Sequence, residues 1–333
     1  MTANQNVTVL GAGSFGTALA HHIAGNGHSV SLWARDETLL RAIREDGENK
    51  KYLSGVALAD SMTCHVDLQQ ALADAEHVLV AIPSQYFSAI LTQVDKHAPQ
   101  TSGVLWACKG FDVESGRFLS DIVLEKLGGD KNYAVISGPT FARELACGQP
   151  TAITIAANVQ SYAESVVQLL HSRRFRTYIS DDIHGVQMGG AFKNIYAIAA
   201  GISDGLNFGA NARVAVITRG LAELMRLGDM LGVSAETLMG LSGVGDLILT
   251  CTDDQSRNRR FGLALGQGQS AEQALEQIGQ SVEGVVATEV ALRLSQEKGV
   301  SMPIVEQVHR VINGLTTPAE AVAVLLGRPS KPE

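Results

Sequence analysis

Long apolar runs and closely spaced cysteines are absent from this chain of 333 residues. No apolar run reaches the roughly 20 residues that a membrane-spanning helix requires, and Met1–Asn6 carries no signal-peptide pattern. The four cysteines have neither the CxxC spacing of a zinc site nor the density of a disulfide scaffold. We therefore expect a soluble cytoplasmic protein with no membrane insertion, no bound metal, and buried or incidental thiols.

An excess of positive charge is absent as well. Lysine and arginine number 26 against 34 aspartate and glutamate, a formal net charge of −8, which argues against nucleic acid as a partner. Charged residues make up 18% and hydrophobic residues 45% of the chain, as in globular rather than disordered proteins. The length suggests two domains.

The segment Val7–Gly16 combines a short strand, a tight turn and the start of a helix. In its Gly-x-Gly-x-x-Gly pattern, Gly11 allows the turn, Gly13 lets the backbone approach a pyrophosphate, and Gly16 lets helix and strand pack closely. The N-terminus of the following helix favours negative charge. The segment therefore predicts a dinucleotide-binding site, and a merely tight turn is the alternative.

Apolar runs alternate with helical stretches over the first half of the chain. Strands are expected at His28–Trp33, Met62–Val66, His77–Ile82, Val104–Ala107, Tyr133–Ile136, Thr151–Ala156 and Phe175–Ile179. Helices are expected from an N-cap at Asp36 to about Arg44, and at Leu68–Ala73, Tyr86–Val94, Phe118–Leu127, Phe141–Ala146 and Val159–Leu170. This alternation predicts a Rossmann-like α/β fold with a doubly wound, mostly parallel sheet.

The pattern changes near residue 180. From Asp182 onward no convincing strand is present, and apolar residues recur at helical spacing in Val186–Ile202, Ala212–Leu227, Ala287–Leu294 and Ile304–Ile312. We therefore expect a dinucleotide-binding domain at residues 1–180 and an all-α, substrate-binding domain at residues 181–333. The tail at residues 328–333 contains two prolines and three charges and is expected to fray.

Ligands of a parallel sheet bind beyond the carboxyl ends of its strands, so the residues that follow each strand are candidates. Arg35 follows the second strand about twenty residues after the glycines, where a cation favours NADP and an acid favours NAD. A solvated Arg35, with Asp36 as the acid, is the alternative. Lys109 follows another strand and suits an anion or a carbonyl oxygen, and a solvated lysine is the alternative. The turn Ser137–Thr140 follows the next strand.

The helical half contains a second set of polar candidates. Lys193 and Asn194 lie in an otherwise apolar helix, and lysine is rarely buried without a partner. A snorkelling side chain is the alternative. Asp246 is a candidate counter-charge for Lys193, and Thr250 follows it by one helical turn. A helix cap and a back-bonding threonine are the alternative for this pair.

A further helix is expected to open at Ser256-Arg257-Asn258. A capping hydroxyl, a bidentate cation and an amide donor at one helix start suit a phosphate group. The alternative is a capped helix that continues as a basic surface run, since Arg259 and Arg260 follow.

Six segments of the chain together resemble bacterial NAD(P)-dependent sn-glycerol-3-phosphate dehydrogenases. They are Gly11 to Gly16, Lys109-Gly110, Ser137-Gly138-Pro139-Thr140, Gly190-Ala191-Phe192-Lys193-Asn194, Gly243-Val244-Gly245-Asp246-Leu247 and Ser256-Arg257-Asn258. They occur in the right order over nearly the whole chain. The resemblance implies reversible hydride transfer between NADH or NADPH and dihydroxyacetone phosphate, which gives sn-glycerol 3-phosphate for glycerophospholipid synthesis.

The resemblance also implies roles for individual residues. Cofactor contacts are implied for the turn glycines Gly11, Gly13 and Gly16 and for Ser14, Phe15, Arg35, Lys109, Ala142, Arg257 and Glu283. Substrate contacts are implied for Lys109, Gly138, Thr140, Lys193, Asp246, Ser256, Arg257 and Asn258. Lys193 is the implied proton donor and acceptor, oriented by Asp246, with positive potential from Lys109 and hydrogen-bonding support from Thr250. Ser281 departs from the family, in which an aliphatic residue often precedes Val282-Glu283.

On this interpretation the substrate binds between the two domains, and the position of Arg35 favours NADPH over NADH. We expect a homodimer from the size of the helical half. Two alternatives stay open: a related two-domain dehydrogenase that acts on a β-hydroxyacid or a sugar acid, and a dinucleotide-sensing module without turnover.

Overall fold

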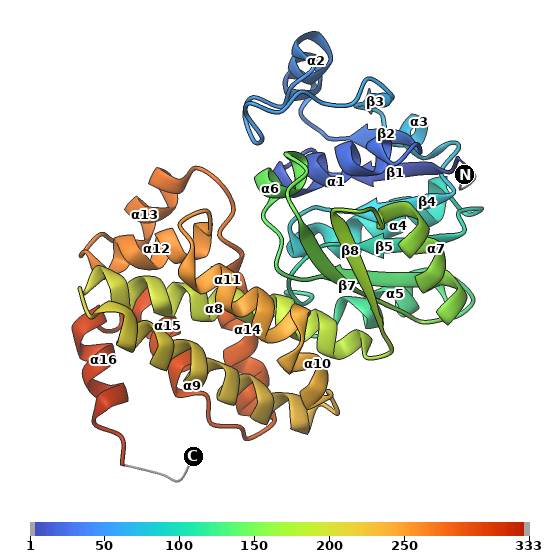
Figure 1. Ribbon diagram of the computed structural model, residues 1–333. Helices are drawn as coiled ribbons and strands as arrows, with labels where there is room; N and C mark the ends of the chain where they lie inside the picture. Colours follow the sequence, from blue (N-terminus) through green and yellow to red (C-terminus); the bar gives the residue numbers. More distant parts are fainter. Residues whose placement is uncertain (1–3, 330–333) are drawn as a thin grey trace. The chain divides into compact units, whose positions relative to one another are not determined.

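The computed structural model describes residues 4–329 of the chain (Figure 1). One compact unit contains the chain up to Asp112 together with Arg117–Val186, and a second contains Val113–Gly116 together with the chain from Gln187 onward. We call them the sheet unit and the helical unit. The expected domain boundary near residue 180 stays a prediction, and residues 330–333 of the tail expected to fray lie outside the described residues.

The sheet unit contains an eight-stranded sheet over its described residues. The strands are β1 (Asn6–Leu10), β2 (Ser29–Trp33), β3 (Met62–His65), β4 (His77–Val80), β5 (Gly103–Trp106), β6 (Asn132–Ser137), β7 (Thr151–Ala157) and β8 (Phe175–Ser180). They lie in the order β3-β2-β1-β4-β5-β6-β7-β8, and all neighbours are parallel except β6 and β7. The predicted fold class is confirmed, and the strand order reverses beside β1, where such sheets bind dinucleotides.

Helices cover both faces of this sheet (Figure 1). Successive strand residues point to opposite faces, so Val7 and Val9 join one buried cluster and Leu10 joins the other. The first cluster is completed by α1 (Ser14–Gly25), α2 (Glu37–Asp46), α6 (Ala142–Ala146) and α7 (Gln160–Leu170). The second is completed by α3 (Leu68–Leu72), α4 (Phe87–His97), which the 3-10 turn η1 (Ser84–Tyr86) precedes, and α5 (Leu119–Leu127).

The helical unit consists of helices and loops over its described residues, as predicted. Its elements are α8 (Ile183–Gly205), which begins in the sheet unit, α9 (Gly209–Met230), α10 (Ala235–Met239), the π-helical turn η2 (Leu241–Gly245), α11 (Asp246–Thr252), α12 (Arg257–Gly266), α13 (Ala271–Ile278), α14 (Glu283–Glu297), α15 (Pro303–Ile312) and α16 (Pro318–Leu326). The sequence did not predict α10, α13 and α16.

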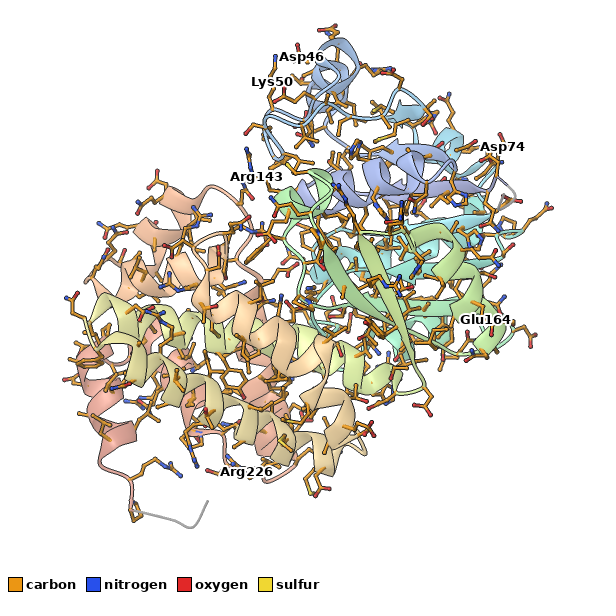
Figure 2. The ribbon with its side chains drawn as sticks, in the orientation of Figure 1. Asp46, Lys50, Asp74, Arg143, Glu164 and Arg226 are labelled. Atoms are coloured by element: carbon orange, nitrogen blue, oxygen red, sulfur yellow. The ribbon has the colours of Figure 1, made fainter. Side chains whose placement is uncertain are left out.

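Charged side chains at the surface of the two units include Asp46, Lys50, Asp74, Arg143, Glu164 and Arg226 (Figure 2). Asp46 and Lys50, for example, form an exposed ion pair at 3.1 Å, of a kind that contributes little stability. Buried charges are different, because each requires a partner. No helix within residues 4–329 is both long enough and apolar enough to cross a bilayer.

Candidate active site

The turn between β1 and α1 carries the glycine motif. Gly11 has a φ of +123°, and a Cβ at this position would overlap the carbonyl of Ala81, so only glycine fits. Around Gly13, apart from its neighbours along the chain, no described atom lies within 4 Å of the place that a Cβ would occupy. Gly13 is also the N-cap of α1 and supplies no capping side chain. The helix start therefore offers backbone amides and room for a ligand, which fits a dinucleotide pyrophosphate.

Asn49 holds this turn from the loop that follows α2. Its amide nitrogen donates to the carbonyl of Ala12 at 3.0 Å and to the Thr17 hydroxyl at 2.9 Å, and its carboxamide oxygen accepts from the Tyr52 amide at 3.2 Å. Asn49 is fully buried. Sequence reasoning missed this residue, because a single asparagine in a loop carries no signal of the distant turn it contacts.

Lys109 follows β5 and reaches two of the other candidates. Its Nζ donates to the carbonyl of Gly138 at 3.3 Å and lies 5.8 Å from the centre of the Phe15 ring, close enough for a cation–π interaction. The structure thus brings Phe15, Lys109 and Gly138 together at the carboxyl ends of the strands, as the order of the parallel strands predicts.

Arg35 follows β2 and is exposed. Its guanidinium carbon lies 5.2 Å from the centre of the Tyr86 ring, beyond the end of β4. The neighbouring Asp36 caps α2, as predicted, by accepting from the Leu39 amide at 3.0 Å, and it pairs with Lys51 at 3.4 Å. The carboxylate that was the alternative ribose ligand is therefore engaged in the helix cap.

Thr140 and Ala142 lie between β6 and β7. The Thr140 hydroxyl is 3.0 Å from the hydroxyl of Thr151 at the start of β7. Ala142 begins α6 and packs against the buried cluster that contains residues of α1. Both residues are half-buried, so each keeps some accessible surface.

Lys193 lies in the middle of α8 with only 8% of its surface exposed. Its Nζ donates to Oδ1 of Asp246, the first residue of α11, which is 1% exposed. The two backbones approach closely because Gly189, about one turn before Lys193, has no Cβ to meet the Ser242 carbonyl of η2. The snorkelling alternative for Lys193 is therefore wrong, since its ammonium group is paired inside the unit.

Thr250 and Cys251 complete the surroundings of this ion pair. The Thr250 hydroxyl donates to the backbone carbonyl of Asp246 at 2.6 Å and lies 3.3 Å from Oδ1 of the same residue. Burial raises the pKa of the Cys251 thiol to about 12, although Lys193 and Arg259 nearby act in the opposite direction. The thiol therefore stays protonated near neutral pH and is not a nucleophile.

The predicted phosphate anchor lies at the start of α12. Ser256 is the N-cap, and its Oγ accepts from the Arg259 amide at 3.2 Å. Arg257 is half-buried and donates to Oε1 of Gln280 at 3.4 Å. The predicted helix start is confirmed, and Gln280 is a contact that the sequence did not indicate.

Asn258 connects three helices of the helical unit. Its amide nitrogen donates to Oδ1 of Asn194 on α8 at 2.9 Å, and its oxygen accepts from the amide of Gly284 on α14 at 2.9 Å. Glu283, the residue before Gly284, is half-buried at the start of α14. The amide nitrogen of Asn194 is buried without a hydrogen-bond partner among the described residues. Asn194, which follows Lys193 in α8, therefore has an unsatisfied buried donor.

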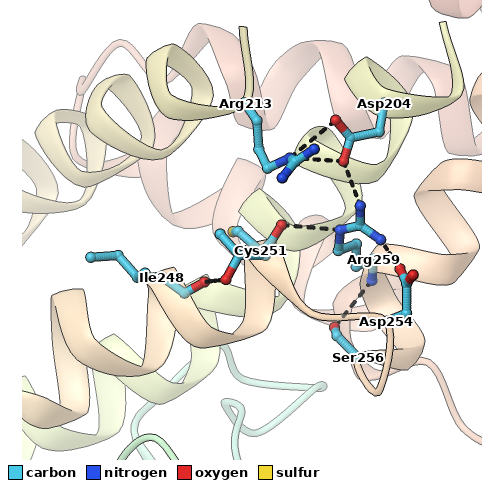
Figure 3. A network of polar contacts seen from close by, with 8 residues as sticks. Asp204, Arg213, Ile248, Cys251, Asp254, Ser256 and Arg259 are labelled. Carbon is cyan, nitrogen blue, oxygen red and sulfur yellow. Dashed lines mark hydrogen bonds and ion pairs between the residues drawn. The ribbon is translucent and has the colours of Figure 1, made fainter. Parts of the chain in front are cut away.

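The structure contradicts part of the alternative interpretation of this helix, the basic surface run. Arg259 is not part of a basic surface run, since only 7% of it is exposed, whereas Arg260 is exposed. The Arg259 guanidinium lies among Asp204, Asp254 and the backbone carbonyl of Cys251 (Figure 3). The sequence run of arginines does not show which of them faces inward, because that depends on which helix lies opposite.

Two family models match the chain. The N-terminal model of NAD-dependent glycerol-3-phosphate dehydrogenase matches residues 6–163, and the C-terminal model matches residues 182–323. A glycerol-3-phosphate dehydrogenase [NAD(P)+] of Thioalkalivibrio sulfidiphilus is 53% identical over 327 residues, which cover 98% of each chain. One of Pseudoalteromonas translucida is 50% identical over 333 residues, or 100% of this chain and 99% of the relative.

Solved structures agree with the sequence matches. The crystal structure of glycerol-3-phosphate dehydrogenase from Coxiella burnetii superimposes with a TM-score of 0.95 at 41% identity, over 98% of this chain and 99% of the other. The glycine turn, the buried lysine–aspartate pair and the capped start of α12 all lie within the matched segments. The chain belongs to the NAD-dependent glycerol-3-phosphate dehydrogenase family.

Proposed function

We propose that this chain is an NAD(P)-dependent oxidoreductase that interconverts dihydroxyacetone phosphate and sn-glycerol 3-phosphate in the cytoplasm, for glycerophospholipid synthesis. The observation that carries the proposal is the buried ion pair of Lys193 and Asp246. The same unit contains the N-terminus of α12 at Ser256, which suits a phosphate group. A buried charge pair is costly to desolvate and adds little stability by itself. A catalytic role explains why such a pair is present.

Lys193 is the proposed acid and base. When bound, the nicotinamide supplies or accepts the hydride. In the direction of reduction, negative charge develops on the carbonyl oxygen of the substrate, and Lys193 stabilises that charge and donates a proton to the oxygen. In the reverse direction the lysine takes the proton back. Asp246 keeps the ammonium group oriented, with Thr250 hydrogen-bonded to Asp246, and Lys109 adds positive potential.

The substrate phosphate is the proposed ligand of the α12 start. Arg257 binds it with a charge-assisted, bidentate interaction, while Ser256 and Asn258 contribute a hydroxyl and an amide at a helix N-terminus that favours anions. Gly138 and Thr140 supply further substrate contacts from the sheet unit.

The cofactor is the proposed ligand of the glycine turn. Ser14 and Phe15 lie in the first turn of α1, and we propose that Arg35, Lys109, Ala142, Arg257 and Glu283 complete its site. The engagement of Asp36 in the cap of α2 leaves Arg35 as the charged group for a ribose 2′-phosphate, which supports a preference for NADPH. Replacing Arg35 with aspartate is expected to weaken NADPH binding more than NADH binding. Equal losses for the two cofactors, measured by fluorescence titration, would argue against this preference.

Three further proposals concern the protein as a whole. The gap between the two family matches, at residues 164–181, supports a domain boundary near residue 180. The four free cysteines support a reducing compartment. A homodimer is proposed from the size of the helical half, and sedimentation of the purified protein measures it directly.

The function is tested by comparing dihydroxyacetone phosphate with unphosphorylated dihydroxyacetone as substrates for NADPH oxidation. We expect kcat/KM to be higher for the phosphate ester by at least about 10²-fold, because several charge-assisted contacts of about 1.5–3 kcal/mol are lost without the phosphate. Equal rates contradict the proposal. Turnover of a β-hydroxyacid instead indicates the related type of dehydrogenase, and NADPH binding without oxidation indicates a sensing module.

A further inference from the structure

The buried guanidinium of Arg259 contacts three separate parts of the helical unit (Figure 3). Its Nε donates to the carbonyl of Cys251 in the last turn of α11 at 3.1 Å, and its Nη2 donates to Oδ2 of Asp204 on α8 at 2.6 Å. Its Nη1 pairs with Asp254 in the turn between α11 and α12. Asp204 also holds Arg213 of α9 through two contacts at 2.9 and 3.1 Å.

These contacts join the elements that carry the proposed site. The helix α8 carries Lys193, with Asp204 about three turns further along the same face. The helix α11 begins with Asp246, and α12 begins with Arg257. A single guanidinium therefore connects the helix of the proton donor, the helix of its counter-charge and the helix start proposed to bind phosphate.

The bodies of α8 and α12 are already held by close backbone packing. A Cβ at Gly262 of α12 would overlap the carbonyl of Ile198, and a Cβ at Gly205 of α8 would lie 2.8 Å from the Cα of Gly266. The same packing reaches the first turn of α12, where a Cβ at Gly201 of α8 would lie 2.1 Å from the carbonyl oxygen of Arg259. The backbone of α12 is therefore held against α8, and the Arg259 side chain adds contacts to α11 and to the turn before α12.

Stability alone is a poor explanation for an arginine at this position. Arg259 is the third residue of α12, where the helix dipole disfavours a cation, and its burial requires desolvation of the charge. The planar guanidinium does, however, hold several acceptors in fixed directions, which lysine cannot do. Geometry, rather than charge, is what Arg259 supplies.

We infer that Arg259 is a positioning residue for the substrate phosphate: it holds the first turn of α12 so that Ser256, Arg257 and Asn258 present their donors together. This inference rests on the proposed function. Ser256 accepts directly from the Arg259 amide at 3.2 Å, so a shift of Arg259 moves the capping hydroxyl with it. The proton donor Lys193 lies on another helix and keeps its own partner, Asp246.

The test is the conservative variant Arg259→Lys, which keeps the positive charge but loses the planar guanidinium group that holds several acceptors. We expect KM for dihydroxyacetone phosphate to rise about tenfold, less than the roughly 10²-fold cost of a misplacement of about 1 Å, because the backbone of α12 stays packed against α8. The value of kcat is expected to stay within about twofold, since proton transfer is unaffected. The value of kcat/KM for unphosphorylated dihydroxyacetone should not change, because this substrate has no phosphate for Arg257 to bind.

The matched control is Arg260→Lys, which makes the same change at the exposed neighbouring residue and should leave all these constants unchanged. Asp204→Asn removes the partner on α8 and should raise the same KM. The double variant with Arg259→Lys should raise KM by less than the two single effects combined, because both changes break the same contact between Arg259 and Asp204. An unchanged KM for dihydroxyacetone phosphate in Arg259→Lys, or an equal loss on both substrates, overturns the inference.

Two further variants keep the result interpretable. If Arg259→Lys does not fold, Asp254→Asn removes a partner that is 76% exposed and should raise the same KM to a smaller extent; no change there overturns the inference. Arg257→Ala is measured in parallel. If it leaves KM for dihydroxyacetone phosphate unchanged, the proposed phosphate anchor is wrong. If it raises KM and Arg259→Lys does not, only the positioning role is wrong.

Discussion

The sheet unit and the helical unit offer their ligands different kinds of groups. Among residues 4–329, the buried lysine, arginine, aspartate and glutamate residues all lie in the helical unit; they are Lys193, Glu223, Asp246 and Arg259. The sheet unit instead presents the backbone of a glycine turn. Amides at a helix N-terminus suffice for a pyrophosphate, whereas proton transfer requires a side chain that titrates. We therefore expect the glycine turn of the sheet unit to be sensitive to added side-chain bulk. The site proposed in the helical unit should instead be sensitive to the removal of a charge.

Lys193→Ala should produce the largest effect. We expect kcat to fall by about 10²–10⁴-fold, the usual contribution of a general acid or base, while the dissociation constant of NADPH stays within about twofold, because the glycine turn is untouched. Steady-state kinetics and fluorescence titration measure the two quantities. The double variant with Asp246→Asn removes the unpaired buried charge and should restore thermal stability without restoring turnover. A preserved kcat contradicts the role of Lys193.

Glu223 on α9 is a buried charge of the helical unit that contacts backbone amides. It accepts from Ile304 at 2.7 Å and from Val305 at 3.4 Å, at the start of α15. Burial raises its pKa from 4.5 to about 7, and these two amides oppose the shift. The folded chain therefore holds an extra proton between about pH 4.5 and about pH 7, so the stability from this group is complete below that window and is lost as pH rises through it.

The loss amounts to about 3 kcal/mol of unfolding free energy for a shift of this size. Chemical denaturation at about pH 5 and about pH 8 measures it, with Glu223→Gln as the comparison because glutamine does not titrate. The pH dependence of the variant should be flatter by that amount. Parallel pH profiles for the two proteins would show that the two backbone amides offset the burial of the carboxylate.

Arg257→Ala should have the next largest effect. Losing a charge-assisted bidentate contact is expected to raise KM for dihydroxyacetone phosphate about 10- to 100-fold, with a smaller change in kcat. The control is Arg260→Ala, on the exposed side of the same helix. If both variants behave alike, the side chains of the helical unit do not bind the phosphate, and the contrast between the two units fails at this point.

Asn49→Ala should have the smallest effect, confined to the sheet unit. The change leaves the Ala12 carbonyl and the Thr17 hydroxyl without the amide that now holds them, at a cost of about 1–2 kcal/mol. The dissociation constant of NADPH is therefore expected to rise about tenfold, with KM for dihydroxyacetone phosphate unchanged. Lys50→Ala, at the exposed neighbour, is the control. A larger change in the substrate constant than in the cofactor constant would show that the turn is not what Asn49 supports.

The parts of the fold that the sequence predicted are those determined by neighbours along the chain. The strand, turn and helix of Val7–Gly16 and the cap at Asp36 depend on residues within a few positions of each other. The alternation of strands and helices predicted the doubly wound sheet for the same reason. The candidate residues of the helical unit were found partly by their chemistry, since a lysine in an apolar helix requires a partner, and partly by resemblance to a known family.

Apart from the predicted pair of Lys193 and Asp246, only the tertiary structure decided which polar groups meet. Asn49 and Ala12 lie 37 positions apart, so no local pattern connects them. Arg259 and Arg260 are adjacent and chemically identical, yet one is buried against Asp204 and the other is exposed. Sequence determines the period of a helix, but the side of it that becomes buried depends on the surface that packs against it.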